Sequence, residues 1–307
     1  MNTSQPIADT VLNSRAIEQQ LIGQVTSDGA GVKLTRLFGQ ALQQRLDPFL
    51  MLDAFGSDSP RDYIAGFPDH PHRGFETMTY LIAGRMRHSD NAGHQGLLEA
   101  GGIQWMTAGR GIIHSEMPEQ QDGLLEGFQL WINLPADAKM QPAAYRDVNR
   151  QQLPELITAD GVAVRVIAGI SHGLAGAIQR PVTEPTILDI RMPAGSGFSQ
   201  RLPAANTAFF AVYRGEVAVD GQAVALGRLA VLANDPEADG VRMRAQQDSR
   251  ILLVSGVPLR QAIVQHGPFV MNTPAQIQQA IADYRTGRLT SARPETPFTD
   301  PTGANHP

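Results

Sequence analysis

HPHRGFETMTYLIAG, residues 70–84, is the stretch of sequence that decides the fold. It begins with two histidines separated by one residue and continues as an apolar run of strand length. In a β-strand, side chains two residues apart point to the same face. His70 and His72 are therefore expected to face the interior of a β-barrel together.

A second pair of candidate ligands repeats this spacing 44 residues further along the chain. His114 and Glu116 lie in GGIQWMTAGRGIIHSEM, residues 101–117. One pair from each of two neighbouring strands would bring three imidazole nitrogens and one carboxylate oxygen to one point. A carboxylate inside such a barrel is costly unless it is paired or bound to a cation. We therefore predict one mononuclear metal site, in preference to separate surface or core histidines.

Glu76 is the alternative acidic residue of this cluster. It lies four residues after His72, and a period of two would place both on the same face. It could replace Glu116 as a ligand, or accept a hydrogen bond from the N–H of a ligand histidine. The sequence pattern alone leaves both roles open.

Other polar residues around the two motifs have weaker patterns. Arg73 and Arg110 flank the motifs and could hold nearby carboxylates or an anionic ligand, or form ordinary surface ion pairs. His88 and His94 lie in RHSDNAGHQG, residues 87–96, which is typical of a loop. We interpret both of these histidines as solvated.

The donor set limits the metal. Three imidazoles and a carboxylate suit Fe(II), Mn(II), Ni(II), Cu(II) or Zn(II), and four protein ligands leave about two positions open on an octahedral ion. A structural zinc site is usually closed by cysteines, and this chain has none. The pattern therefore favours a divalent ion that is open to a substrate or dioxygen.

The rest of the chain predicts an all-β protein with two barrels. Short apolar runs, such as GFQLWINLP (127–135), alternate with turn residues in two successive sets. One helix is expected over 274–287, with a proline in its first turn and a glycine at its end. The predicted divisions are a tail at 1–20, a metal-binding barrel at 21–135, a linker at 136–155, a barrel without a metal site at 156–290 and a disordered tail at 291–307.

Composition excludes several classes of protein. The chain has 307 residues and a formal net charge of −5, without a basic stripe that could neutralise phosphates, so direct nucleic-acid binding is not expected. The N-terminal residues lack the pattern of a signal peptide, and no apolar stretch is long enough for a transmembrane helix. We expect a cytoplasmic protein that does not bind membranes.

The two histidine motifs resemble the pirin family of the cupin superfamily. HPHRGFETMTYLIAG (70–84) and GGIQWMTAGRGIIHSEM (101–117) carry most of the likeness. GHQG (93–96) and GPFVMNT (267–273), which is followed by the expected helix, add to it. The resemblance covers about residues 20–290.

The resemblance implies a bicupin, with two jelly-roll β-barrels stacked face to face and a single metal, commonly iron, in the N-terminal barrel. It places the ligands on His70, His72, His114 and Glu116. Ordinary cupins take their glutamate ligand at the position of Glu76. The resemblance therefore favours Glu116, and Fe(II) among the divalent ions.

The resemblance implies two kinds of function. In the first hypothesis the protein is a quercetin 2,3-dioxygenase that cleaves a flavonol with dioxygen and releases carbon monoxide. Glu116, or alternatively Glu76, would be the catalytic base. In the second, the metal controls a surface that binds a protein partner, as in transcriptional or metabolic co-regulators. We lean towards the enzyme. Aromatic and other apolar side chains near the motifs could line the substrate pocket or belong to the barrel core: Phe75, Trp105, Met106 and Phe128.

Overall fold

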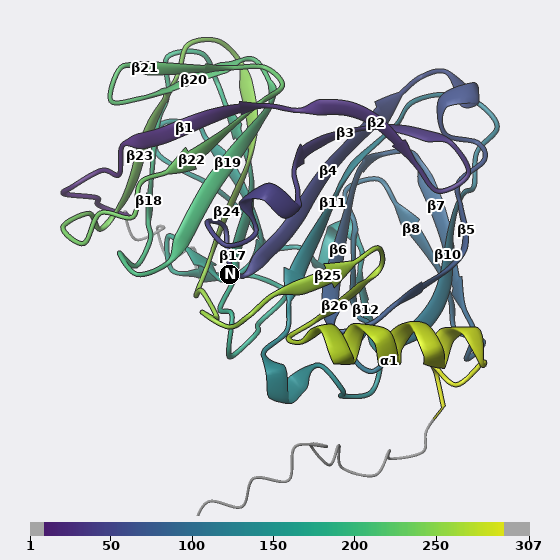
Figure 1. Ribbon diagram of the computed structural model, residues 1–307. Helices are drawn as coiled ribbons and strands as arrows, with labels where there is room; N and C mark the ends of the chain where they lie inside the picture. The colour runs from purple at the N-terminus through teal and green to yellow at the C-terminus, as the bar shows by residue number, and fades with distance from the viewer. Residues whose placement is uncertain (1–8, 292–307) are drawn as a thin grey trace, which may run out of the picture.

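The computed structural model describes residues 9–291 as two antiparallel β-barrels that lie against each other, with one α-helix towards the C-terminal end (Figure 1). Each barrel combines a seven-stranded with a four-stranded sheet. The predicted all-β fold of two stacked jelly-roll barrels is therefore confirmed. Residues 1–8 of the predicted N-terminal tail and 292–307 of the predicted disordered tail lie outside the described residues. No helix in the described part has both the length and the apolar character needed to cross a membrane.

The N-terminal barrel carries both histidine motifs. Its large sheet has the order β12-β9-β6-β11-β4-β3-β2, and its small sheet has the order β5-β10-β7-β8. The strands are β2 (Gln24–Asp28), β3 (Val32–Phe38), β4 (Phe49–Ser57), β5 (Phe67–His72), β6 (Phe75–Ala83), β7 (Arg85–Asp90), β8 (Gln95–Glu99), β9 (Ile103–Thr107), β10 (Ile112–Pro118), β11 (Leu125–Asn133) and β12 (Ala144–Val148). Short 3-10 helices are η1 (Gln40–Leu42), η2 (Pro60–Asp62), η3 (Ala136–Ala138) and η4 (Arg150–Gln152).

The C-terminal barrel repeats this architecture. Its large sheet has the order β1-β22-β19-β24-β17-β14-β13, and its small sheet has the order β18-β23-β20-β21. The strands are β1 (Ile17–Ile22), β13 (Glu155–Ile157), β14 (Ala163–Ala168), β15 (Ile170–Ser171), β16 (Leu174–Ala175), β17 (Thr186–Met192), β18 (Gly197–Arg201), β19 (Thr207–Arg214), β20 (Glu216–Val219), β21 (Gln222–Ala225), β22 (Arg228–Leu232), β23 (Gly240–Ala245) and β24 (Ser249–Gly256).

The start of the chain differs from the prediction. Residues 17–22 form β1, which pairs with β22 at the edge of the C-terminal sheet, where the sequence predicted a tail ending at residue 20. Three of the six residues of this strand, IEQQLI, are polar and none is fully buried, so its composition resembles that of a tail. The predicted linker also differs, because β12 within it belongs to the N-terminal barrel.

The two large sheets share one apolar core. Phe209 of β19 contacts Phe38 and Phe49 of the N-terminal barrel edge to face, with ring centroids 5.2 and 5.3 Å apart. All three side chains are buried, and the same cluster contains Met78 of β6 and Leu252 of β24. Burial of this surface holds the barrels together, at about 25 cal/mol per Å² of apolar area.

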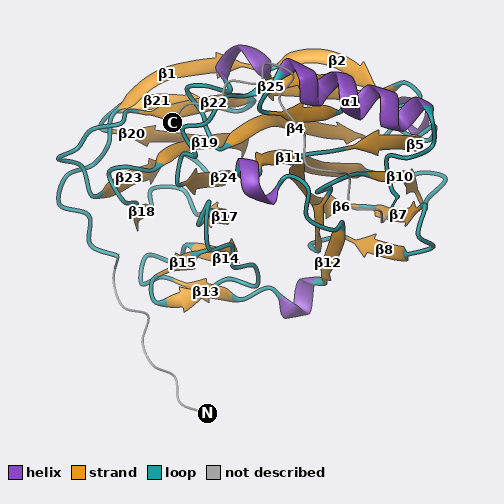
Figure 2. Ribbon diagram, turned by 60° about the horizontal axis from the view of Figure 1, so that its bottom comes forward, coloured by secondary structure: helices purple, strands orange, loops and turns teal. Residues whose placement is uncertain are grey.

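The end of the chain crosses back to the N-terminal barrel. The hairpin of β25 (Val264–His266) and β26 (Phe269–Met271) leads into α1 (Pro274–Arg285), which lies against that barrel (Figures 1 and 2). Thr273 and Gln276 form a capping box at the start of α1, and Gly287 follows its end with φ of 72°. The helix predicted over 274–287 is present, but the predicted 156–290 domain contains a segment that packs outside its own barrel.

Candidate metal centre

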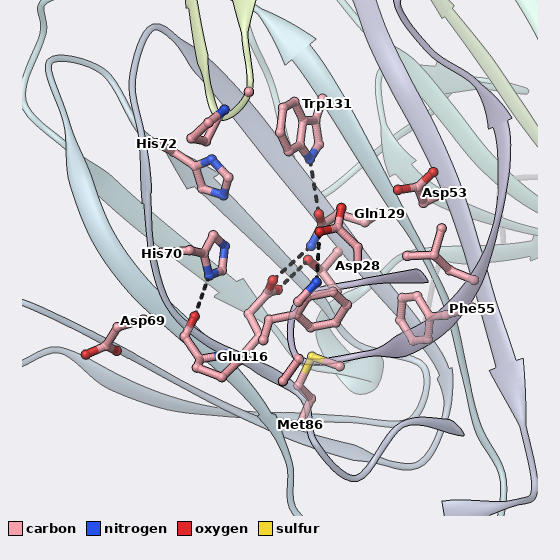
Figure 3. A pocket seen from close by; sticks show the side chains of 18 residues that line it. Asp28, Asp53, Phe55, Asp69, His70, His72, Met86, Glu116, Gln129 and Trp131 are labelled. Carbon is pink, nitrogen blue, oxygen red and sulfur yellow. Dashed lines mark hydrogen bonds between the residues drawn. The ribbon is translucent and has the colours of Figure 1, made fainter. Parts of the chain in front are cut away.

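Strands β5 and β10 bring three histidines together. They pair in antiparallel register, with His114 opposite His70 and Ile112 opposite His72. The candidate ligand atoms of His70, His72 and His114 all lie within 4.8 Å of one another. The period of two in β5 and the pairing of β5 with β10 therefore bring the three histidines together, and Figure 3 shows His70 and His72 side by side.

The hydrogen bonds of these imidazoles leave nitrogens available for a metal. His70 Nδ1 lies 2.8 Å from the carbonyl oxygen of Pro68, which fits an Nδ1–H donor and leaves Nε2 as the ligand atom. Nδ1 of His72 and both ring nitrogens of His114 are buried without a hydrogen-bond partner. Buried nitrogens of this kind are costly unless something binds them. The histidine cluster therefore fits a single metal ion.

Burial also sets the protonation state of two histidines. It lowers the pKa of His72 well below the usual range, and the neighbouring His70 adds to the effect. Burial lowers the pKa of His114 in the same direction, helped by His72 and His70. A neutral imidazole is the form that binds a metal. The apolar surroundings thus favour the ligand form of both rings.

Glu116 lies in the same cavity but outside the group of three. Its carboxylate accepts hydrogen bonds from Thr79 Oγ1 at 3.1 Å and Gln129 Nε2 at 2.9 Å. The register between β10 and β5 shifts between His114 and Glu116, so that Glu116 faces Phe67. A bulge of this kind redirects a side chain. The carboxylate is therefore held beside the histidines by donors of its own.

Glu76 is directed elsewhere. It accepts a hydrogen bond from Thr107 Oγ1 at 2.6 Å and forms an ion pair with Arg180 of the second barrel at 2.9 Å. The period of two from His72 does not continue to Glu76, because the chain turns at Gly74 with φ of +91°. Glu76 lies in strand β6 of the large sheet and does not line the histidine cavity.

Arg73 directly follows β5, the strand that carries His70 and His72. It is buried and holds α1 and the residues after this helix against that strand. Its Nη1 lies 2.7 Å from Asp283 of α1, and its Nη2 donates to the carbonyl oxygen of Leu289 at 3.2 Å. The guanidinium also donates to the Arg110 carbonyl oxygen. The interpretation of Arg73 as part of an ordinary surface ion pair is wrong, because its side chain is only 4% exposed.

Gly74 allows the close approach of the C-terminal hairpin. A Cβ atom there would lie 1.9 Å from the carbonyl oxygen of Val270. Buried Lys139 joins the same strands, donating to the carbonyl oxygens of Gly74 at 2.7 Å and Val270 at 3.0 Å. The hairpin is thereby fixed beside His72.

The apolar residues proposed for the pocket belong to the core. Phe75 stacks on Trp131 with centroids 4.3 Å apart and meets His72 edge to face. Met106, Trp105 and Phe128 are buried in apolar clusters, and none of the four lines the cavity. Phe75 therefore packs against the His72 ring as part of the core.

The cavity in front of the histidines has a volume of about 510 Å³ and a wall that the sequence did not reveal. Its apolar lining comes from Leu34, Phe55, Phe67, Met86 and Trp131. Its acidic lining comes from Asp28, Asp53, Asp69 and Glu116. Figure 3 shows Glu116 and Gln129 between the histidines and the opposite wall at Asp53 and Phe55. The volume lies within the range of small-molecule sites.

Asp53 is the most buried acid of the opposite wall. Burial raises its pKa, and the Arg36 guanidinium opposes that shift through two hydrogen bonds of 2.9 and 2.8 Å. Strand alternation in β4 could have indicated an inward Asp53, but not which strand closes over the histidines.

The interpretation of His88 as a solvated loop residue is wrong. It lies in β7 opposite Glu116, is 4% exposed, and its Nε2 is 2.9 Å from Asp147. His94 is exposed, as expected, and bonds Asp90. The segment forms a strand because it completes the small sheet, although its composition is polar.

Comparison with known proteins agrees with this geometry. The family model Pirin matches residues 31–132, and the model Pirin C-terminal cupin domain matches residues 187–290. A Pseudomonas aeruginosa protein named "Putative quercetin 2,3-dioxygenase" is 52% identical over 274 residues, which cover 87% of this chain and 95% of that protein.

Two further relatives agree. A pirin-like protein of Caulobacter vibrioides is 47% identical, over 87% of this chain and 96% of its own length. The crystal structure of quercetin 2,3-dioxygenase from Acinetobacter baumannii superposes with a TM-score of 0.83 at 32% identity, covering 91% of this chain and all of that one. With two family models and relatives of this similarity over nearly the whole fold, the chain belongs to the pirin family of bicupin proteins.

Proposed function

We propose that this protein is a metal-dependent dioxygenase that cleaves flavonols in the manner of a quercetin 2,3-dioxygenase. The observation that carries the proposal is the group of three converging histidines, two of them with unpartnered buried nitrogens, beside a cavity with an apolar wall. The names of the relatives from Pseudomonas aeruginosa and Acinetobacter baumannii support the same reaction.

The proposed cofactor is one Fe(II) ion, held by His70, His72 and His114, with Glu116 as the fourth ligand. Mn, Ni, Cu or Zn would fit the same donors. When bound, the ion would supply Lewis acidity that lowers the pKa of a flavonol hydroxyl, and a site for dioxygen chemistry.

Glu116 is proposed as the general base. Its carboxylate faces the cavity, and Thr79 and Gln129 hold both of its oxygens. It would accept the proton of the flavonol hydroxyl. Because Glu116 lies outside the close group of three histidines and has hydrogen-bond donors of its own, its carboxylate need not stay on the ion while it accepts this proton.

The cavity wall suits a flat polyphenol. Phe55, Phe67 and Trp131 offer apolar surface for aromatic rings, and Asp28 and Asp53 offer acceptors for hydroxyl groups. In the overall reaction, quercetin and dioxygen give one ring-opened ester and one carbon monoxide. Both atoms of dioxygen enter the ester, and one ring carbon leaves with its oxygen.

The proposal is tested by measuring carbon monoxide released from quercetin by Fe(II)-loaded protein and its Glu116→Gln variant. We expect kcat to fall about 100-fold or more, the usual contribution of a general base. Glu99→Gln, at an exposed carboxylate, is the matched control and should keep full activity. An absence of carbon monoxide from the loaded wild-type protein would overturn the enzymatic proposal and leave the regulatory alternative.

Gln129→Leu tests how Glu116 is positioned. The change removes the amide that donates to Glu116 and accepts from Trp131 Nε1 at 3.1 Å. We expect kcat for quercetin to fall about tenfold while the iron content stays the same. Gln95→Leu, at an exposed position of β8, is the control. An unchanged kcat in Gln129→Leu would show that this hydrogen bond does not position the base.

A further inference from the structure

A second cavity lies between the two barrels and shares no lining residue with the histidine cavity. Its volume is about 850 Å³. The N-terminal barrel contributes apolar Ile82 and Leu124, and the C-terminal barrel contributes three arginines: Arg191, Arg214 and Arg250. This volume is within the range of cavities that hold small organic molecules.

The three arginines stand in a row across adjacent strands. Arg191 of β17 is the direct register partner of Arg250 of β24, and Arg250 is the direct partner of Arg214 of β19. Directly opposed residues of antiparallel strands project from the same face. Like charges in such positions destabilise a sheet unless counter-charges compensate them.

Only the two outer arginines of the row are compensated. Arg191 forms an ion pair with Glu155 at 2.9 Å. Arg214 forms two hydrogen bonds of 2.7 Å with the carboxylate oxygens of Glu126 across the cavity. Within residues 9–291, the central Arg250, which is exposed to solvent, has neither an ion pair nor a side-chain hydrogen bond to another residue.

Asp248 is the remaining acid of the cavity, and within residues 9–291 it forms no ion pair with any of the three arginines. Its Oδ1 accepts the backbone N–H of Ala194 at 2.9 Å. Arg250 thus lines the cavity without a direct counter-charge of its own, between two arginines that each have one.

We propose that this cleft binds a small organic anion, in which a phosphate or carboxylate group contacts Arg250 and an apolar portion lies against Ile82 and Leu124. A guanidinium matches both anions because its planar fork can donate two parallel hydrogen bonds. The anion would supply the direct counter-charge that Arg250 lacks. This proposal does not depend on the chemistry at the histidines.

The test is calorimetric titration of the metal-loaded full chain with phenyl phosphate, benzoate and benzyl alcohol. These probes share a ring and differ in the polar group. We expect saturable binding of at least one anion and no binding of the alcohol. The anion with the higher affinity shows whether the cleft prefers a phosphate or a carboxylate group. Arg250→Gln should weaken that binding about tenfold or more. Arg244→Gln, at an exposed arginine of β23 that lies outside the cleft, should leave it unchanged.

Thermal unfolding provides the second readout. Without ligand, Arg250→Gln should not lower Tm, because the change removes a repulsive neighbour of Arg191 and Arg214. With the anion that binds, Tm should rise for the wild-type protein and not for Arg250→Gln. If Arg250→Gln fails to fold, Arg250→Lys, which keeps the charge but loses the planar fork, takes its place in both assays. The proposal is overturned if the wild-type protein binds neither anion, or if Arg250→Gln binds as tightly as Arg244→Gln.

Discussion

Replacing His72 by alanine is expected to abolish stoichiometric metal binding. The residue supplies one of three converging imidazoles, and its unpartnered Nδ1 is buried. Losing even a residue that only orients a ligand costs about 10–100-fold in metal affinity, so losing a ligand should cost at least that. The measurement is the metal content of dialysed protein by elemental analysis, together with competition by a chelator.

The matched control is His94→Ala, at a histidine whose side chain is 68% exposed and outside the cluster. It should bind metal as the wild-type protein does. Tm of each metal-free variant separates loss of a ligand from loss of the fold, because truncating a buried ring also leaves a cavity. One tightly bound metal per chain in a folded His72→Ala variant would exclude this residue as a ligand.

Asp283→Asn is expected to destabilise the protein by about 3–5 kcal/mol. The change leaves the Arg73 guanidinium buried without its counter-charge, and removing one partner of a buried ion pair carries a cost of this size. The exposed fractions are 4% for the Arg73 side chain and 0% for Asp283. Urea unfolding of the metal-free protein, followed by fluorescence, measures the change.

An exposed ion pair gives the control for this second prediction. Glu99→Gln removes a carboxylate that is 66% exposed and 3.6 Å from Arg85, and such surface pairs contribute at most about 1 kcal/mol. The double variant Arg73→Met/Asp283→Leu should recover part of the lost stability, because it removes both charges. Equal urea midpoints for Asp283→Asn and Glu99→Gln would contradict a stabilising role for the Arg73–Asp283 pair.

The histidine cluster could be predicted from the sequence because the spacing of its residues within each motif determines which way their side chains face. The two-residue repeat of a β-strand determines which side chains share a face, and the second motif supplied the third imidazole. The C-terminal helix was accessible for a similar reason, since Thr273, Pro274 and Gly287 mark its ends. The family resemblance supplied the pairing of the two barrels, which local patterns do not encode.

Features that depend on long-range contacts could not be predicted. The Glu76 alternative assumed an unbroken strand, whereas the chain turns at Gly74. His88 occurs in a polar segment that becomes a strand only by pairing with β8 and β10. The edge strand β1 lacks a clear strand pattern in sequence and gains its partner more than 200 residues away, at β22.

The opposite wall of the cavity has the same origin. Asp28, Asp53 and Phe55 come from β2, β4 and their neighbourhood, at least 15 residues before His70 in the sequence. Nothing in their local pattern relates them to the histidines. Closure of the large sheet over the small sheet brings them to the site.

The most direct test of a flavonol dioxygenase is the fate of isotopically labelled dioxygen. Fe(II)-loaded protein and metal-stripped protein are each mixed with quercetin under ¹⁸O₂, and the organic product and carbon monoxide are analysed by mass spectrometry. The account predicts two labelled oxygens in the organic product and one unlabelled carbon monoxide per quercetin consumed, from the loaded protein alone. Unlabelled product, or equal yields from loaded and stripped protein, would contradict it.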